Sequence, residues 1–96
     1  MSKKELIESK RELLLQVAKE HGALSLQLFG SVARGEDDEA SDVDFLVKLE
    51  KGRSLFDLGG LQMALQSVLD CSVDVVTVNG LRERIRQSIL DEAIAI

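Results

Sequence analysis

The sequence predicts a small α/β (α+β) domain in which one sheet is covered by helices. Three stretches have the alternating or β-branched pattern of strands, and four have helical spacing, in the order α-β-α-β-α-β-α. The chain has 96 residues, of which 45% are hydrophobic and 30% charged, a globular balance. It contains no proline and no linker-like segment, so we expect residues 1–96 to form a single domain.

The first helix is expected over residues 3–21. Ser2 and Glu5 have the spacing of a capping box, apolar residues then recur at helical intervals, and Gly22 provides a C-terminal stop. Leucines next alternate with polar residues over 24–29. This period of two predicts the first strand.

The rest of the chain alternates in the same way. The segment after the first strand contains two glycines and an acidic cluster, so it allows at most a short helical turn that starts at Ser31. A second strand is expected over Asp42–Leu49 and a leucine-rich helix over Leu55–Leu69. The β-branched run Val73–Val78 predicts a third strand, and Asn79 is suited to cap a last helix.

Composition narrows the classes of function. The net charge of -5 disfavours autonomous nucleic-acid binding, because phosphate backbones are bound mainly by Lys and Arg. A single histidine excludes a multi-histidine zinc site, so metal chemistry would rest on carboxylates, which suit magnesium or manganese. No apolar run approaches the roughly 20 residues of a membrane span, and the charged N-terminus lacks an apolar signal core. We therefore expect a cytoplasmic protein.

Asp42 and Asp44 stand two apart on the expected second strand. Their carboxylates would share one face, about 7 Å apart at the backbone, so that their oxygens could converge on one cation. Val43, Phe45 and Val47 would form the opposite, buried face and so fix the register. An isolated pair of this kind is more often a solvated strand edge, so the pair alone is a weak signal.

Asp74 interrupts the β-branched run of the third strand, where a lone carboxylate requires a reason. If the second and third strands are neighbours, Asp74 can join Asp42 and Asp44 on one face, around a space for one or two magnesium ions. Leu46 also lies on that face, just beyond the pair. The alternative is an outward-facing acid on a half-buried strand.

Gly30 and Ser31 lie where the first strand ends and a helical turn would begin. At such a position, backbone N–H groups and the serine hydroxyl can receive phosphate oxygens. An ordinary strand-to-helix connection capped by the serine is the alternative. Arg34 could reach phosphate with its planar fork or pair with an acid among residues 36–39, and the nearby acids favour pairing.

The glycine–serine pair at 30–31, the Asp-x-Asp pair at 42–44 with ten residues between, and the later Asp74 together resemble the polymerase-beta-like nucleotidyltransferase superfamily. The segments LFGSVARGEDDEASDVDFLV and VDVVT resemble more closely the minimal nucleotidyltransferases, or MNT family. These are small stand-alone versions of that fold, often paired with a helical HEPN ribonuclease toxin. The resemblance covers about residues 24–96 and implies the nucleotidyltransferase fold with a mixed sheet.

The resemblance also implies roles for individual residues. Asp42 and Asp44 would bind two catalytic Mg²⁺ ions, and Asp74 would support a metal and the attacking hydroxyl. Gly30 and Ser31 would hold the phosphates of ATP. The implied activity is transfer of AMP from ATP to a hydroxyl, with tyrosine the expected acceptor, on a HEPN-type toxin for which this chain is the antitoxin.

Two other interpretations stay open. The first is a non-catalytic binding module that neutralises its partner by occlusion, through apolar faces on the first or last helix. Its candidate residues are Leu6, Leu14, Ile85 and Ile89. The second is a nucleic-acid-modifying transferase, which the negative charge and the lack of room for an acceptor domain disfavour. Arg82, Arg84 and Arg86 form a basic run, which we interpret as a solvated helix face.

Overall fold

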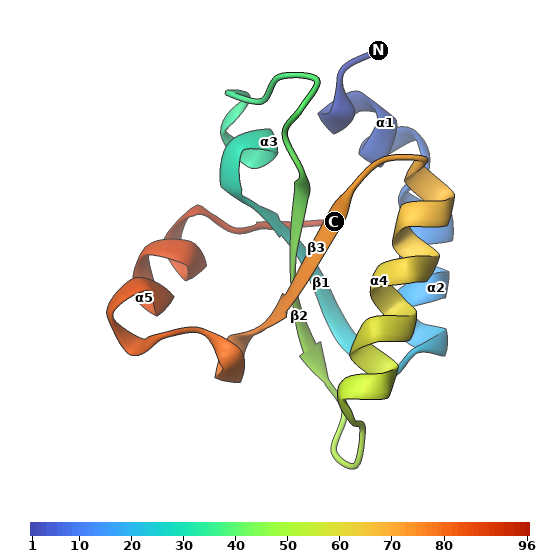
Figure 1. Ribbon diagram of the computed structural model, residues 1–96, viewed down its shortest axis with the longest axis vertical. Coiled ribbons are helices and arrows are strands. Elements are labelled where there is room, and N and C mark those ends of the chain that lie inside the picture. The colour runs from blue at the N-terminus through green and yellow to red at the C-terminus, as the bar shows by residue number, and fades with distance from the viewer.

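The computed structural model describes residues 1–96 as a mixed four-stranded sheet packed with helices (Figure 1). The helices are α1 (Lys3–Ser9), α2 (Arg11–Glu20), α3 (Gly30–Arg34), α4 (Leu55–Leu69) and α5 (Glu83–Glu92). The strands are β1 (Ala23–Phe29), β2 (Val43–Leu49), β3 (Val73–Thr77) and β4 (Ile94–Ala95). None of the helices combines the length and the apolar character that a membrane crossing requires.

The sheet has the strand order β3-β2-β1-β4. β2 and β3 are parallel, whereas β1 pairs antiparallel with both β2 and β4. The mixed sheet that the resemblance implied is therefore confirmed. In Figure 1, α1, α2 and α4 lie to one side of the strands, and α5 lies to the other. The two helices α2 and α4 also pack against each other.

The N-terminal helical region consists of two helices, so the single helix expected over residues 3–21 is wrong. The capping box is confirmed, because the Ser2 side chain accepts the Glu5 N–H and the Glu5 carboxylate accepts the Ser2 N–H at 3.0 Å. The break falls at Lys10, whose φ of −110° and ψ of 16° end α1 and begin α2. Ile7 in α1 and Leu14 in α2 are both buried. The helical spacing of apolar residues therefore continues across the break, which is why the sequence pattern does not predict the break.

The break lets α1 reach the loop that precedes β2. Lys3 Nζ donates hydrogen bonds to the backbone carbonyls of Asp38 and Ser41 in that loop. Lys4 Nζ donates to the carbonyl of Ala33 in α3, at 3.2 Å. These tertiary contacts outweigh the local preference for one continuous helix.

The main core lies between the sheet and the pair α2 and α4. Val43, Phe45 and Val47 of β2 are no more than 1% exposed, which confirms the predicted buried face. Leu46 points to the opposite face, yet it is fully buried as well. That face is therefore also covered beyond Asp44, on the side of the sheet where α5 lies in Figure 1.

The C-terminal region differs from the expectation. Asn79 does not cap the last helix, because residues Val78–Gly80 form a 3₁₀ turn in which the Thr77 hydroxyl accepts the Gly80 N–H at 3.0 Å. α5 begins later, with Arg82 at its N-cap. The chain then adds a strand that was not expected, β4, which is too short to show a period of two.

Candidate active site

Asp44 and Asp74 are brought together by the parallel ladder of β2 and β3. They are direct partners in the register, so their side chains leave the same face of the sheet, with the strands roughly 4.8 Å apart. Asp44 is half-buried, and Asp74 is exposed. Asp42 lies one residue before β2 begins and is exposed. The strand adjacency that the sequence left conditional is therefore present.

The charges of the neighbouring side chains act on the carboxylate of Asp44. Partial burial raises the pKa of Asp44, and the negative charges of Asp74 and Asp42 raise it further. The positive charge of Arg34 opposes this rise. A divalent cation beside Asp44 would favour its ionised form, since the cation would supply the missing counter-charge.

The donor set fits magnesium only in part. No group of three or more His, Cys, Asp or Glu side chains is placed so that it could hold a metal ion by itself. Magnesium, however, is commonly bound by one or two carboxylates together with substrate phosphates and waters, and carboxylate oxygens are its preferred protein ligands. Asp42, Asp44 and Asp74 thus suit only an ion whose other ligands come from outside the chain.

Gly30 follows β1 directly and lies against Asp44. Asp44, Asp42 and Asp74 are together called the acidic cluster. The Gly30 φ of +78° lies in the left-handed region, and a β-carbon at this position would collide with Asp44 Oδ2. Only glycine lets the chain turn here while it touches the carboxylate. Because the turn occurs at Gly30, α3 begins there with Phe29 at its N-cap. The expected cap at Ser31 is therefore wrong; Ser31 is the second residue of α3 and is half-buried.

Arg34 makes the acidic pairing that the sequence favoured, and a second pairing that it missed. Its Nε bonds Glu36 Oε2 at 2.9 Å, and its Nη1 bonds Glu92 Oε1 at 2.9 Å. Glu92 Oε2 also accepts the backbone N–H of Gly30 at 2.7 Å. These bonds to Gly30 and Arg34 lower the pKa of Glu92. No periodicity could link Glu92 to the glycine–serine turn, since the sheet alone brings them together.

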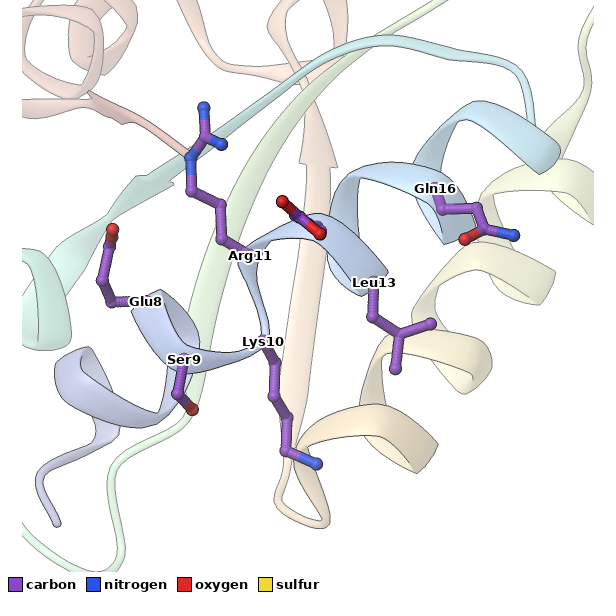
Figure 2. Close-up of a pocket in the computed structure, with 7 residues that line it drawn as sticks. Glu8, Ser9, Lys10, Arg11, Leu13 and Gln16 are labelled. Atoms are coloured by element: carbon purple, nitrogen blue, oxygen red, sulfur yellow. The ribbon is translucent and has the colours of Figure 1, made fainter.

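The largest hollow of the surface is remote from this site. It has a volume of about 590 Å³ and lies at the junction of α1 and α2. Figure 2 shows Glu8, Lys10, Arg11 and Gln16 at its wall, projecting in different directions, with Leu13 the one apolar side chain. None of the hollows is lined by Asp42, Asp44 or Asp74.

The residues considered for an occluding surface do not form one exposed face. Leu14 is fully buried and Leu6 packs against the core, so neither is available to a partner. Ile85 is 42% exposed, and Ile89 is half-buried. The most exposed apolar side chains within a helix are instead Leu55, Phe56 and Met63 of α4.

The basic run on α5 is only partly solvated. Arg82 and Arg84 are exposed, as expected. Arg86 is half-buried, and its Nη2 donates to the Leu81 carbonyl at 3.1 Å. The predicted solvated face is therefore wrong for Arg86, because the guanidinium folds back on the segment before α5.

Comparison with known proteins agrees with this geometry. A family model described as a nucleotidyltransferase domain matches residues 10–96. The chain belongs to this nucleotidyltransferase family. A solved structure assigned as a minimal nucleotidyltransferase is 44% identical, has a TM-score of 0.90, and is matched over 100% of this chain and 97% of its own. The minimal nucleotidyltransferase resemblance and the predicted fold are thereby confirmed.

Two further proteins are similar to this nucleotidyltransferase. A protein of Methanocaldococcus jannaschii assigned as protein adenylyltransferase MJ0435 is 40% identical over 89 residues, which are 93% of this chain and 95% of the relative. A toxin-antitoxin crystal structure with AMP-PNP has a TM-score of 0.75 over 88% of this chain and 69% of the other. At 21% identity, this second likeness shows the shared fold.

Proposed function

We propose that this nucleotidyltransferase moves AMP from ATP to a hydroxyl of a partner protein, with magnesium as cofactor. The observation that carries the proposal is the pairing of Asp44 with Asp74 on adjacent strands, directly beside Gly30 at the end of β1. This places carboxylates next to a backbone turn, as a metal-bound triphosphate requires. The similarity to a protein assigned as an adenylyltransferase supports AMP as the transferred group.

The three carboxylates would have different roles in the reaction. Asp42 and Asp44 would hold the two magnesium ions, whose chemistry would be to neutralise the charge that develops on the α-phosphoryl group and the leaving pyrophosphate. Asp74 is more exposed than Asp44, so an incoming acceptor could approach it. It would complete the metal shell and orient or accept the proton of the attacking hydroxyl.

The glycine–serine turn would receive the phosphates. The Ser31 hydroxyl and the backbone N–H of Ser31 would supply hydrogen-bond donors beside the acidic cluster, while the N–H of Gly30 is bonded to Glu92. Arg34 keeps one nitrogen, Nη2, without a hydrogen bond in the chain, and its side chain is 46% exposed. A phosphate oxygen could therefore bind Arg34 without breaking its two ion pairs.

The partner we propose is a HEPN-type ribonuclease toxin, with this chain as its antitoxin in a hetero-oligomer. The shared fold with a chain of a toxin-antitoxin complex that contains AMP-PNP supports this assignment. The chain contains no tyrosine, so a modified tyrosine in a mixture of the two proteins would lie on the partner.

A second candidate is neutralisation by occlusion, without catalysis. The observation that favours it is the apolar surface on α4, where Phe56 is 91% exposed and Met63 is 71% exposed. Phe56 and Met63 are seven residues apart and so lie on one side of the helix, and contiguous apolar patches are typical of contact surfaces between proteins. On this interpretation the acidic cluster would not be needed for protection.

The test compares wild type with Asp44→Asn. The toxin is incubated with each protein, ATP and magnesium, this chain is stripped away, and the toxin's mass and ribonuclease activity are measured. Transfer predicts a toxin that carries added AMP and stays inactive after wild type only, including at substoichiometric amounts of this chain. Full recovery of toxin activity after both proteins would reject transfer and support occlusion.

A further inference from the structure

We propose that Glu92 is a positioning residue for the nucleotide phosphates, acting through Gly30 and Arg34. This inference rests on the proposed function, because it concerns how the same site holds ATP. The hydrogen bonds of Glu92 go to Gly30 and Arg34, and none goes to Asp42, Asp44 or Asp74. Its role is to fix the turn at Gly30, whose N–H it accepts, and the guanidinium of Arg34, whose free Nη2 would contact a phosphate.

The carboxylate of Glu92 joins the two ends of α3. Oε2 accepts the N–H of Gly30, the first residue of α3, at 2.7 Å. Oε1 and Oε2 accept from Nη1 of Arg34, the last residue of α3, at 2.9 Å and 3.2 Å. One side chain from another element therefore sets the orientation of a backbone amide and of a guanidinium.

The backbone around Glu92 is itself held in place. β4 begins two residues after Glu92 and pairs antiparallel with β1, with Ala95 opposite Gln27 and Ile94 opposite Leu28. β1 ends at Phe29, directly before Gly30. The ladder thus aligns the end of α5 with the end of β1, and the reach of Glu92 to Gly30 follows from strand pairing.

The carboxylates of Glu36 and Glu92 leave one nitrogen of the Arg34 guanidinium, Nη2, free to bind another group. Glu36 accepts from Nε and Glu92 from Nη1, while Nη2 makes no hydrogen bond. The pair with Glu36 is a solvated surface pair, in which the Glu36 side chain is 65% exposed, so it constrains Arg34 weakly. The Glu92 side chain is only 26% exposed and bonds the backbone as well. Glu92 is therefore the contact that fixes the guanidinium.

Electrostatics and positioning predict opposite effects of removing this charge. The negative charge of Glu92 raises the pKa of Asp44, so it adds to the repulsion that a triphosphate meets at this site. If charge alone mattered, neutralising Glu92 would tighten ATP binding. If Glu92 positions the phosphate contacts, neutralising it weakens binding although a repulsive charge has been removed.

The experiment measures Kd for ATP with magnesium by calorimetry, and KM and kcat for transfer to the toxin, in wild type and Glu92→Gln. We expect Kd and KM to rise roughly 5–10-fold, as for the loss of one ordinary hydrogen bond, with a smaller change in kcat. The matched control is Asp91→Asn, which removes the same charge from the neighbouring residue and affects only the contact with Gln87. Its Kd should stay within about twofold of wild type.

A double-mutant cycle tests the route through Arg34. Glu92→Gln should change Kd less in an Arg34→Gln background than in wild type, because part of its effect passes through that guanidinium. Equal changes in the two backgrounds would overturn that route. A folded Glu92→Gln protein that binds ATP as tightly as wild type, or more tightly, would overturn the whole inference.

The two proposals fail in different ways. If wild type does not bind ATP at all, the proposed function fails. If wild type binds and Glu92→Gln does not fold, Glu92→Asp replaces it, since the shorter carboxylate keeps the charge but cannot span Gly30 and Arg34 together. An unchanged Kd in Glu92→Asp would then overturn the positioning role, and a raised Kd would support it.

Discussion

Gly30 lies against the carboxylate of Asp44, with no room between them for a β-carbon. The positive φ of Gly30 and this contact are two separate reasons for glycine at the position. They can be separated by comparison with Gly35, whose φ is also positive, at +72°, but whose α-carbon faces open space.

We expect Gly30→Ala to be more destabilising than Gly35→Ala. The backbone cost should be similar in both, about 1 kcal/mol, while the collision with Asp44 should add roughly 1–3 kcal/mol in Gly30→Ala. Chemical denaturation of the two variants measures the difference. Equal losses would show that the carboxylate moves aside freely, whereas partial recovery in Gly30→Ala with Asp44→Ala would locate the cost at this contact.

We expect Asp44→Asn to stabilise the protein at neutral pH, by about 0.2–1 kcal/mol, because it removes a like charge beside Asp74. The folded-state pKa of Asp44 is raised above its ordinary value of 3.8, so the folded state holds the proton more tightly than the unfolded chain. The destabilisation of the folded state by ionised Asp44 is therefore fully present above the folded-state pKa and absent below the unfolded-state pKa.

The gain in Asp44→Asn should therefore shrink as the pH falls through that window. Thermal unfolding of wild type and variant across a pH series measures this. Glu39→Gln, which removes a charge from the exposed loop, provides the control and should show no comparable gain. A gain that persists unchanged at low pH would contradict the electrostatic origin.

We expect Asp42→Asn and Asp44→Asn to lower the rate of AMP transfer by at least about 100-fold, since each would remove a metal ligand worth several kcal/mol in the transition state. Circular dichroism should show an intact fold in both. Magnesium titration of the residual activity gives the matching readout. Turnover near that of wild type at ordinary magnesium levels would contradict the metal assignment.

We expect Ser31→Ala to weaken nucleotide binding by about 1–2 kcal/mol, because it deletes one hydroxyl donor and keeps the backbone donors of α3. This loss should be smaller than the catalytic loss in Asp44→Asn. Calorimetry with ATP and magnesium measures it. An affinity equal to that of wild type would mean that the hydroxyl does not contact the nucleotide.

Local patterns in the sequence were sufficient for the central strand. The burial of Val43, Phe45 and Val47 follows from alternation alone, and this alternation places Asp44 on the other face of the sheet. The position of Asp74 beside Asp44 required the order of the strands, which periodicity does not contain. The family resemblance implied a mixed sheet but not the order of its strands, because parallel pairing is determined by the path of the chain between two strands.

The features that could not be predicted depend on contacts between distant segments. The break at Lys10 lies within a continuous helical pattern and is explained by the bonds of Lys3 and Lys4 to distant carbonyls. Glu92 reaches Gly30 across 62 residues, through a two-residue strand with no pattern of its own. The family motif covered the acids and the glycine–serine turn, but not the side chain that holds the turn.

The parallel course of β2 and β3 affects the order of folding events. Parallel neighbours cannot close as a hairpin, so the chain must pass through the whole of α4 before β3 can dock on β2. The entropy of closing that loop is lost before the ladder compensates for it, which makes docking of β3 a late event. Asp44 and Asp74 therefore first meet in this step, where the repulsion between them opposes the approach of the strand. We therefore expect the acids proposed for catalysis to slow the docking of β3 on β2.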